Sequence, residues 1–130
     1  MELKHYFDSH QGLGILSTAD GEGRVDAAVY ARPQFLADGR LALLMRERLT
    51  YSNLQQNPHA VYLFVQDAPG YQGVRLYLQK VGEDDNPQLI QQLTRPCLSP
   101  AEDAAAGPKH VVYFHLERAL QLIGGQPWGG

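Results

Sequence analysis

The stretch "VDAAVYARPQFLADGRLALLMRERLTYSNLQQNPHAVYLFV", residues 25–65, determines the order of structural elements in this chain. Two apolar runs flank the turn "ADGR", and an Asp-Gly pair between apolar runs is a strong signal for a β-hairpin. A short helix is predicted over residues 50–57, because Thr50 is a suitable N-cap and Pro58 disfavours helical geometry in the residue before it. Another apolar strand follows that proline. The stretch therefore predicts strand, strand, short helix and strand, in that order.

The sequence on both sides of this stretch adds strands and short helices. Upstream, a second Asp-Gly turn, "DGEGR", joins the strand "GLGILSTA" to the stretch. Downstream, Asn86 and Pro87 predict a helix start, because Asn is a favoured N-cap and proline is tolerated at the first helical position. Six strands in short antiparallel steps favour a β-barrel or sandwich over a parallel α/β sheet. The other predicted elements are a helix over residues 1–10, strands over 74–81 and 109–123, a polar loop over 98–108 and an irregular tail.

Length and composition favour one domain spanning residues 1–130. The 11 basic residues are outnumbered by 14 acidic ones, so the chain has no general signature of nucleic-acid binding. Its start lacks the apolar core of a signal peptide, and no run approaches the ~18 apolar residues of a membrane helix. The single cysteine, Cys97, excludes an internal disulfide and a multi-cysteine metal site. We expect a cytoplasmic protein with no membrane or nucleic-acid partner.

A basic corner lies where the strand "LALLMR" gives way to the predicted helix. Side chains alternate along a strand, so Arg46 and Arg48 are predicted to share one face, with Glu47 on the other. The helix start at Thr50 adds unpaired backbone N–H groups and a partial positive charge, which together attract phosphate. Arginine adds a bidentate geometry that suits phosphate oxygens. The alternative is that both arginines are merely solvated beside an ordinary N-cap.

The order of these features resembles that of a known family. A strand, a "GR" turn, a second strand, a basic and hydroxyl-bearing corner, a short helix ending in "NP" and an apolar strand are similar to the core pattern of the FMN-binding split-barrel family related to pyridoxamine 5'-phosphate oxidase. The resemblance implies a mainly β fold with small helices (α+β), namely a six-stranded antiparallel Greek-key split β-barrel. It also implies FMN as the cofactor, with the phosphate at the basic corner.

The resemblance assigns residues to the two ends of the flavin. The strand "AAVYA" would flank the isoalloxazine ring. Many members of the family carry lysine where this chain has Thr50, so the arginines would have to supply the positive charge. The residues assigned to the phosphate and ribityl chain are Arg46, Arg48, Leu49, Thr50 and Asn53, and those assigned to the ring and its surroundings are Ala28, Val29, Tyr30, Ala31, Leu44 and Met45.

The resemblance also implies a homodimer that holds each flavin at the subunit interface. Arg75 and Trp128 would then reach the flavin of the neighbouring subunit. The alternative for Arg75 is a solvated strand residue. For Trp128 the alternatives are packing and an irregular, disordered tail.

The remaining polar residues form no recognisable catalytic or metal-binding motif. The five histidines are spaced as in no known metal motif, and Cys97 follows a proline at a position typical of packing. No metal site and no catalytic side chain are therefore predicted. The leading hypothesis is an FMN-binding flavoprotein that acts as a small flavin-dependent oxidoreductase, flavin reductase or electron-transfer protein. The alternatives are a non-catalytic module that binds a flavin or haem, and a dimeric scaffold that has lost its cofactor.

Overall fold

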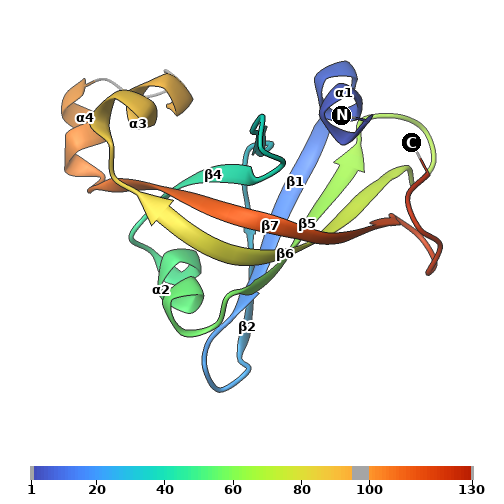
Figure 1. The fold of residues 1–130 in the computed structure, drawn as a ribbon, viewed down its shortest axis with the longest axis horizontal. Helices are drawn as coiled ribbons and strands as arrows, with labels where there is room; N and C mark the ends of the chain where they lie inside the picture. The colour runs from blue at the N-terminus through green and yellow to red at the C-terminus, as the bar shows by residue number, and fades with distance from the viewer. Residues whose placement is uncertain (1, 95–99, 130) are drawn as a thin grey trace.

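The structure, a computed structural model, describes residues 2–94 and 100–129, which form an antiparallel sheet with short helices (Figure 1). The helices are α1 (Glu2–Ser9), α2 (Leu49–Gln56), α3 (Pro87–Leu93) and α4 (Pro100–Ala105). The strands are β1 (Gly12–Ala19), β2 (Val25–Val29), β3 (Gln34–Phe35), β4 (Leu41–Arg46), β5 (His59–Gln66), β6 (Gly73–Asp84) and β7 (Lys109–Gln121). Among the described residues, no helix has the length and apolar character needed to cross a lipid bilayer.

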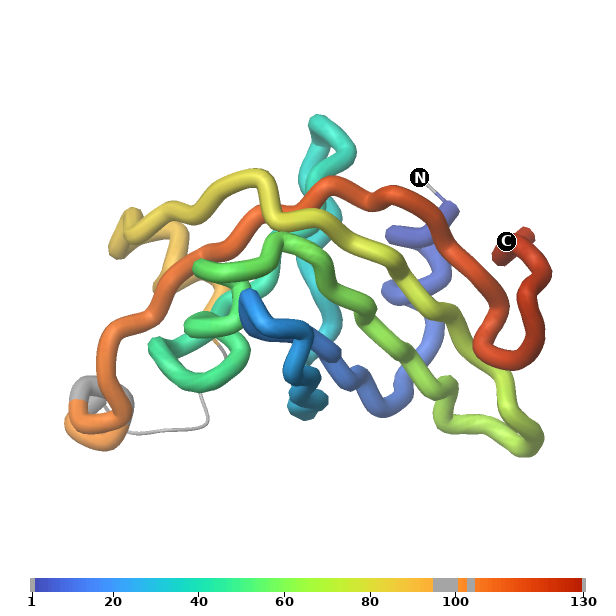
Figure 2. The backbone as a smooth tube through the Cα atoms, turned by 90° about the horizontal axis from the view of Figure 1, so that it is seen from below, coloured from blue at the N-terminus to red at the C-terminus, as the bar shows by residue number. Residues whose placement is uncertain are grey.

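The seven strands lie in the order β2-β1-β5-β6-β7-β4-β3, and the sheet is strongly curved. Its edge strands, β2 and β3, are consecutive in the chain and are separated only by residues 30–33. A linker of this length spans less than about 20 Å, so the two edges have to approach one another. The result is a barrel that is split between its edges. α2 contacts β1, β2 and β4 and lies toward one end, whereas α1 lies toward the other (Figures 1 and 2).

The core lies inside this curve and follows from strand alternation. Leu16, Tyr62 and Leu76 are aligned across β1, β5 and β6, and none of them is exposed. At one end, α1 buries Leu3 and Phe7, and the Phe7 ring lies 4.8 Å from that of Phe64. Apolar area removed from water along these rows is the main stabilising term.

The predicted fold class is confirmed, because the molecule is mainly β with small helices and all its strand pairs are antiparallel. β5 follows β4 and α2 in the chain but pairs with β1, which makes the connection of Greek-key type. The sheet has seven strands where six were predicted. The apolar run 25–36 forms two strands because it is broken around Pro33, which has no backbone N–H to donate to a ladder.

The helices confirm one prediction made from the sequence and correct two others. The Asn86 side chain accepts from the first turn of α3, as predicted for an N-cap. Thr50 is not the N-cap of α2, because Arg48 has the extended backbone of that position (φ -122°, ψ -164°) and the helix begins at Leu49. The loop predicted over 98–108 contains α4, whose proline start and alanine-rich sequence favour helix. Cys97 lies outside the described residues.

Gly14 is expected to be essential for the closure of the barrel. A Cβ at this position would overlap the Tyr62 hydroxyl, which donates to the Tyr30 and Ala31 carbonyls (3.3 and 3.1 Å). Gly14→Ala should lower the free energy of unfolding by about 2 kcal/mol, because overpacking a closed core costs about 1–3 kcal/mol. Gly125→Ala, which has open space around it, is the control and should change stability by less than about 0.5 kcal/mol. Denaturant unfolding measures both, and equal stabilities would contradict the prediction.

Candidate functional site

The basic corner is the turn between β4 and α2. Arg46, the last residue of β4, donates from Nη1 to the Gly107 carbonyl (2.6 Å). The backbone N–H of Arg48 donates to the Arg46 carbonyl (2.9 Å), and this tight turn ends the alternation of the strand. The side-chain directions of Arg46 and Arg48 are therefore not set by the alternation of a single strand, contrary to the prediction from the sequence. Arg46 is tied to the segment before β7, whereas Arg48 is exposed at the N-cap of α2.

The start of α2 offers backbone donors to a ligand. Arg48 makes no side-chain hydrogen bond to the first turn of the helix, so the N–H groups there keep their capacity to bind an anion. Leu49 is 58% exposed, which leaves this turn open to solvent. The partial charge of the helix N-terminus and the charge of the guanidinium have the same sign. The corner can therefore bind an anion such as a phosphate.

The end of β2 meets this corner through Tyr30. Burial raises the pKa of the Tyr30 phenol above its ordinary value, while a hydrogen bond with the Thr50 side chain and the charge of Arg48 act in the opposite direction. The phenol therefore stays protonated and neutral at physiological pH. Three predicted residues from two distant parts of the sequence are thus brought together.

Asn53 lies one turn further along α2 and contributes to packing. Its Nδ2 donates to Thr18 Oγ1 (3.0 Å), and both side chains are buried. This hydrogen bond ties α2 to β1. Asn53 was predicted to contact the ribityl chain. Its amide N–H group is instead used to dock the helix.

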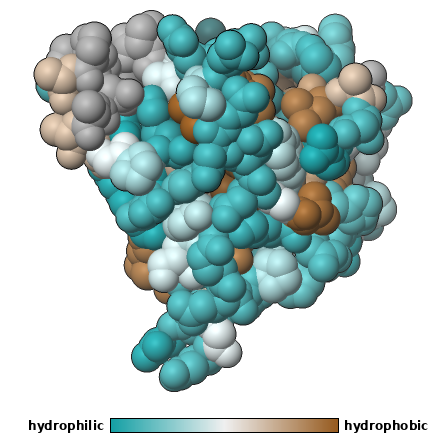
Figure 3. All heavy atoms as spheres, turned by 60° about the vertical axis from the view of Figure 1, so that its left-hand side comes forward, coloured by the Kyte–Doolittle hydropathy of each residue, from teal (hydrophilic) through white to brown (hydrophobic). Residues whose placement is uncertain are grey.

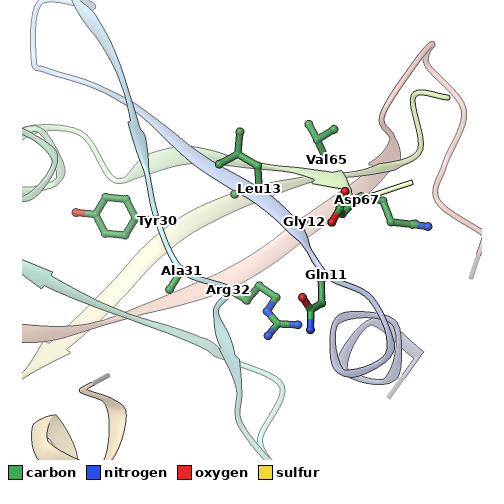
Figure 4. A pocket seen from close by; sticks show the side chains of 10 residues that line it. Gln11, Gly12, Leu13, Tyr30, Ala31, Arg32, Val65 and Asp67 are labelled. Carbon is green, nitrogen blue, oxygen red and sulfur yellow. The ribbon is translucent and has the colours of Figure 1, made fainter. Parts of the chain in front are cut away.

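A cavity of about 660 Å³ opens beside the end of β2 (Figure 4). Arg32 is anchored at its wall, because Nη1 donates to the Phe7 and His10 carbonyls at the end of α1 (2.7 and 2.9 Å). In Figure 4 the side chains of Arg32 and Gln11 point toward the same side, while the Tyr30 ring points away from both. The lining residues are Gln11, Gly12, Leu13, Gly14, Tyr30, Ala31, Arg32, Val65, Gln66 and Asp67.

Sequence reasoning missed most of this cavity. The available signal was the pair Gly12 and Gly14, because glycine inside a strand often marks a close approach of backbone or ligand. A Cβ at Gly12 would indeed overlap the Val65 carbonyl. No local pattern singles out Arg32, because its partners, Phe7 of α1 and His10 just after it, are 25 and 22 residues away in sequence.

The other residues assigned to the flavin ring have different environments. Ala28 is half-buried and Val29 is 71% exposed on the edge strand β2, next to Tyr30. Ala31 is exposed and lines the cavity. Met45 is 3% exposed and belongs to the core, whereas Leu44 is half-buried and alternates to the other side of β4. Contact of a ligand with Met45 would require the core to rearrange.

Arg75 and Trp128 both lie against the end of β7 and the tail that follows it. The Arg75 guanidinium donates to the carbonyls of Gln121 and Gly124, at the turn into the tail. Trp128 is half-buried and packs on Tyr6 with ring centroids 5.4 Å apart. This end carries the C-terminus and α1, opposite the end with α2 (Figure 1). A second cavity, of about 430 Å³, opens here and is lined in part by Tyr6, Tyr71, Ile123 and Trp128.

The side of the molecule that carries α3 and α4 is mainly hydrophilic. Figure 3 shows its apolar side chains in small, separate patches among polar ones. An extended apolar binding surface is therefore not visible on this face. Among the described residues, the corner and these two cavities are features that can hold a ligand.

Solved structures match almost the whole chain. HupZ from Group A Streptococcus has a TM-score of 0.73 and 18% identity, over 98% of this chain and 97% of its own. An FMN-binding protein from Syntrophomonas wolfei subsp. wolfei has a TM-score of 0.70 and 17% identity, over 91% of this chain and 82% of its own. A pyridoxamine 5'-phosphate oxidase-related, FMN-binding protein from Nostoc punctiforme has a TM-score of 0.63 and 14% identity, over 92% of this chain and 81% of its own.

The fold is that of the FMN-binding split barrels related to pyridoxamine 5'-phosphate oxidase. The family resemblance of residues 25–65 is confirmed at the level of this split-barrel fold. Comparison of the sequence with protein-family models and with curated proteins gave no match. Ligand and activity therefore have to be argued from the site itself.

Asn53→Ala is expected to lower the free energy of unfolding by about 1–2 kcal/mol, because Thr18 loses its partner in a buried site. Gln55→Ala, exposed on the same helix, is the control and should change it by less than about 0.5 kcal/mol. Thermal or denaturant unfolding compares the two variants. An unchanged stability of Asn53→Ala would mean that its buried hydrogen bond is not needed to dock the helix.

Proposed function

We propose that this protein binds FMN, with the phosphate at the corner between β4 and α2 and the isoalloxazine ring along the end of β2. The observation that carries the proposal is the contact of Tyr30 with Thr50 beside Arg48, because it joins the ring edge to the phosphate corner. The fold shared with FMN-binding proteins supports it. We infer a small cytoplasmic flavin-dependent oxidoreductase, flavin reductase or electron-transfer protein.

Each part of the site would have its own task. Arg48 and the first-turn N–H groups of α2 would hold the phosphate, since charge-assisted hydrogen bonds suit that anion. The Thr50 side chain is 3% exposed and would support the site through its hydrogen bond with Tyr30. The cavity beside Tyr30 would admit the ring or a substrate, with Arg32 and Asp67 as its charged lining residues. A bound flavin supplies hydride and electron transfer, for which side chains have no equivalent. The Tyr30 phenol is neutral, so it would help to orient the flavin without repelling its phosphate.

We also propose a homodimer, because the outer face of the sheet has an apolar part across β2, β1 and β5. Val29, Ile15 and Leu63 lie in register on the outer side of β2, β1 and β5, and Val29 is 71% exposed. An apolar face of this kind needs a cover. A second copy would supply it and would let the end that carries Arg75 and Trp128 act on the flavin of the other subunit.

FMN is expected to bind more tightly than riboflavin. Arg48→Ala should weaken FMN by about tenfold to hundredfold and leave riboflavin unchanged, because one charge-assisted hydrogen bond is worth about 1.5–3 kcal/mol. Arg40→Ala, which removes a surface pair with Asp38 (2.8 Å) on another hairpin, is the matched control and should change neither affinity. Quenching of flavin fluorescence measures all of these constants.

Equal affinities of the wild type for FMN and riboflavin would sink the phosphate assignment. The absorbance spectrum of the purified protein then separates the alternatives. Flavin bands support a flavoprotein, a Soret band would indicate a haem-binding module, and the absence of both after incubation with each ligand would indicate a scaffold without a cofactor.

Leu63→Lys is expected to convert the dimer to a monomer, because it places a charge in the apolar part of the outer face. Val81→Lys is the control, since Val81 is 54% exposed on the distal part of β6, away from this register. Sedimentation or light scattering at low micromolar concentration gives the mass of each. A wild type that is monomeric and still binds FMN would refute the shared site.

A further inference from the structure

His110, near the start of β7, is enclosed by groups from three other segments. Its Nε2 lies 2.7 Å from Oε2 of Glu47, in the turn before α2. Its Nδ1 contacts Oδ1 of Asp85, just after β6. The ring stacks on Tyr51 of α2, with centroids 4.6 Å apart and 16° between the planes. Only 11% of the His110 side chain is exposed, whereas the Glu47 and Asp85 side chains are 51% and 70% exposed.

Both ring nitrogens must carry a proton to serve both carboxylates. A neutral imidazole has one N–H, so one carboxylate would face a nitrogen lone pair, whereas the imidazolium donates to both. Burial acts to lower the pKa of His110, but the hydrogen bonds and charges of Asp85 and Glu47 outweigh it and raise the pKa above its ordinary value. The geometry therefore favours the cation.

Glu47 stands between the two arginines of the phosphate corner. An uncompensated carboxylate there would repel a phosphate, since like charges a few ångströms apart interact even in a solvated site. Arg46 donates to the carbonyl of Gly107, three residues before His110. This part of the corner is therefore held against the segment that leads into β7. The contact with His110 thus both directs the Glu47 carboxylate and offsets its charge.

We propose that His110 is a positioning residue for anion binding: its imidazolium retains Glu47 against β7 and neutralises it, so that the corner presents Arg48 and the start of α2 to a phosphate group. The inference rests on the proposed FMN site and adds to it a residue that acts through Glu47. It also makes the site sensitive to pH, because the imidazolium can lose its proton.

Other titratable groups face the cluster from the elements around it. Burial, followed by the hydrogen bond to Glu83, raises the pKa of Tyr51 to about 12, so this phenol stays neutral when His110 titrates. His110 is the one histidine of the cluster, and histidine titrates closest to neutrality. Other charged residues in the described part of the chain also lie nearby. Lys80 contacts Glu83 (3.8 Å), Asp84 accepts from the Tyr113 hydroxyl (3.5 Å), and Lys109 donates to the Thr94 hydroxyl (2.9 Å).

Rescue by a second substitution is the central test. His110→Gln leaves Glu47 uncompensated and should weaken FMN about fivefold to tenfold, with riboflavin unchanged. The double variant His110→Gln with Glu47→Gln removes the stranded charge and should bring FMN affinity back to within about twofold of wild type. His115→Gln, at an exposed position on the same strand, is the control and should have no effect. Loss of FMN affinity without rescue would overturn the inference.

An NMR titration of the His110 ring needs no flavin. Its midpoint should lie above the ordinary value of about 6.5 and should fall in Glu47→Gln. Because the folded-state pKa is raised, the contribution of the cation is complete below the unfolded value and is lost as pH rises through the folded one. The ratio of FMN to riboflavin affinity should therefore decrease over that range in wild type, and decrease less in Glu47→Gln.

The outcomes separate this inference from the proposed function. A wild type without preference for FMN refutes the function and with it the role of His110 in anion binding, even if the NMR midpoint is high. A wild type that prefers FMN, with a His110 midpoint at or below the ordinary value, refutes the inference alone. If His110→Gln does not fold, the pH profiles of wild type and Glu47→Gln decide, and identical profiles overturn the inference.

Discussion

The connection between β2 and β3 constrains the rest of the molecule, because its four residues join the two edges of a seven-stranded sheet. Such a sheet cannot stay open when its edges are tied so closely. The connection is held from inside by the Tyr62 hydroxyl, which satisfies the Tyr30 and Ala31 carbonyls. Arg32 holds its far end to α1. Curvature, closure of the core and the position of Tyr30 all follow from this tether.

The gap that remains between the two edges of the sheet leaves groups exposed that can contact a ligand. α2 lies across it and is docked by the buried pair Asn53 and Thr18, which leaves the start of the helix at the surface beside Tyr30. If a paired strand lay there instead of α2, its backbone N–H groups would be used in the hydrogen bonds of the sheet. The split in the sheet thus supplies both the helix start at which we propose that an anion binds and the access to it.

The three consecutive charged residues of the corner are directed to different partners. Arg46 bonds to Gly107, Glu47 bonds to His110, and Arg48 stays exposed near Tyr30. One cation is therefore presented to solvent, while the other two charges anchor the turn to β7 and to the segment before it. The same division explains why two arginines in sequence do not amount to a doubly basic surface.

The sequence by itself determined the features that depend on neighbouring residues. Asp-Gly turns and alternating apolar runs predict the hairpins, and Asn86 before Pro87 predicts the start of α3, because turn and cap energies act over a few positions. The Thr50 cap and the 98–108 loop were wrong, because Arg48 has the N-cap backbone and Ala-rich propensity forms α4.

Only the tertiary structure decided how the site is assembled. It placed Met45 in the core and put Trp128 at the other end from Arg48. It also joined His110 to Glu47 across 63 residues. Contacts of this kind depend on which strands become neighbours when the sheet curls, and no local pattern of residues carries that information.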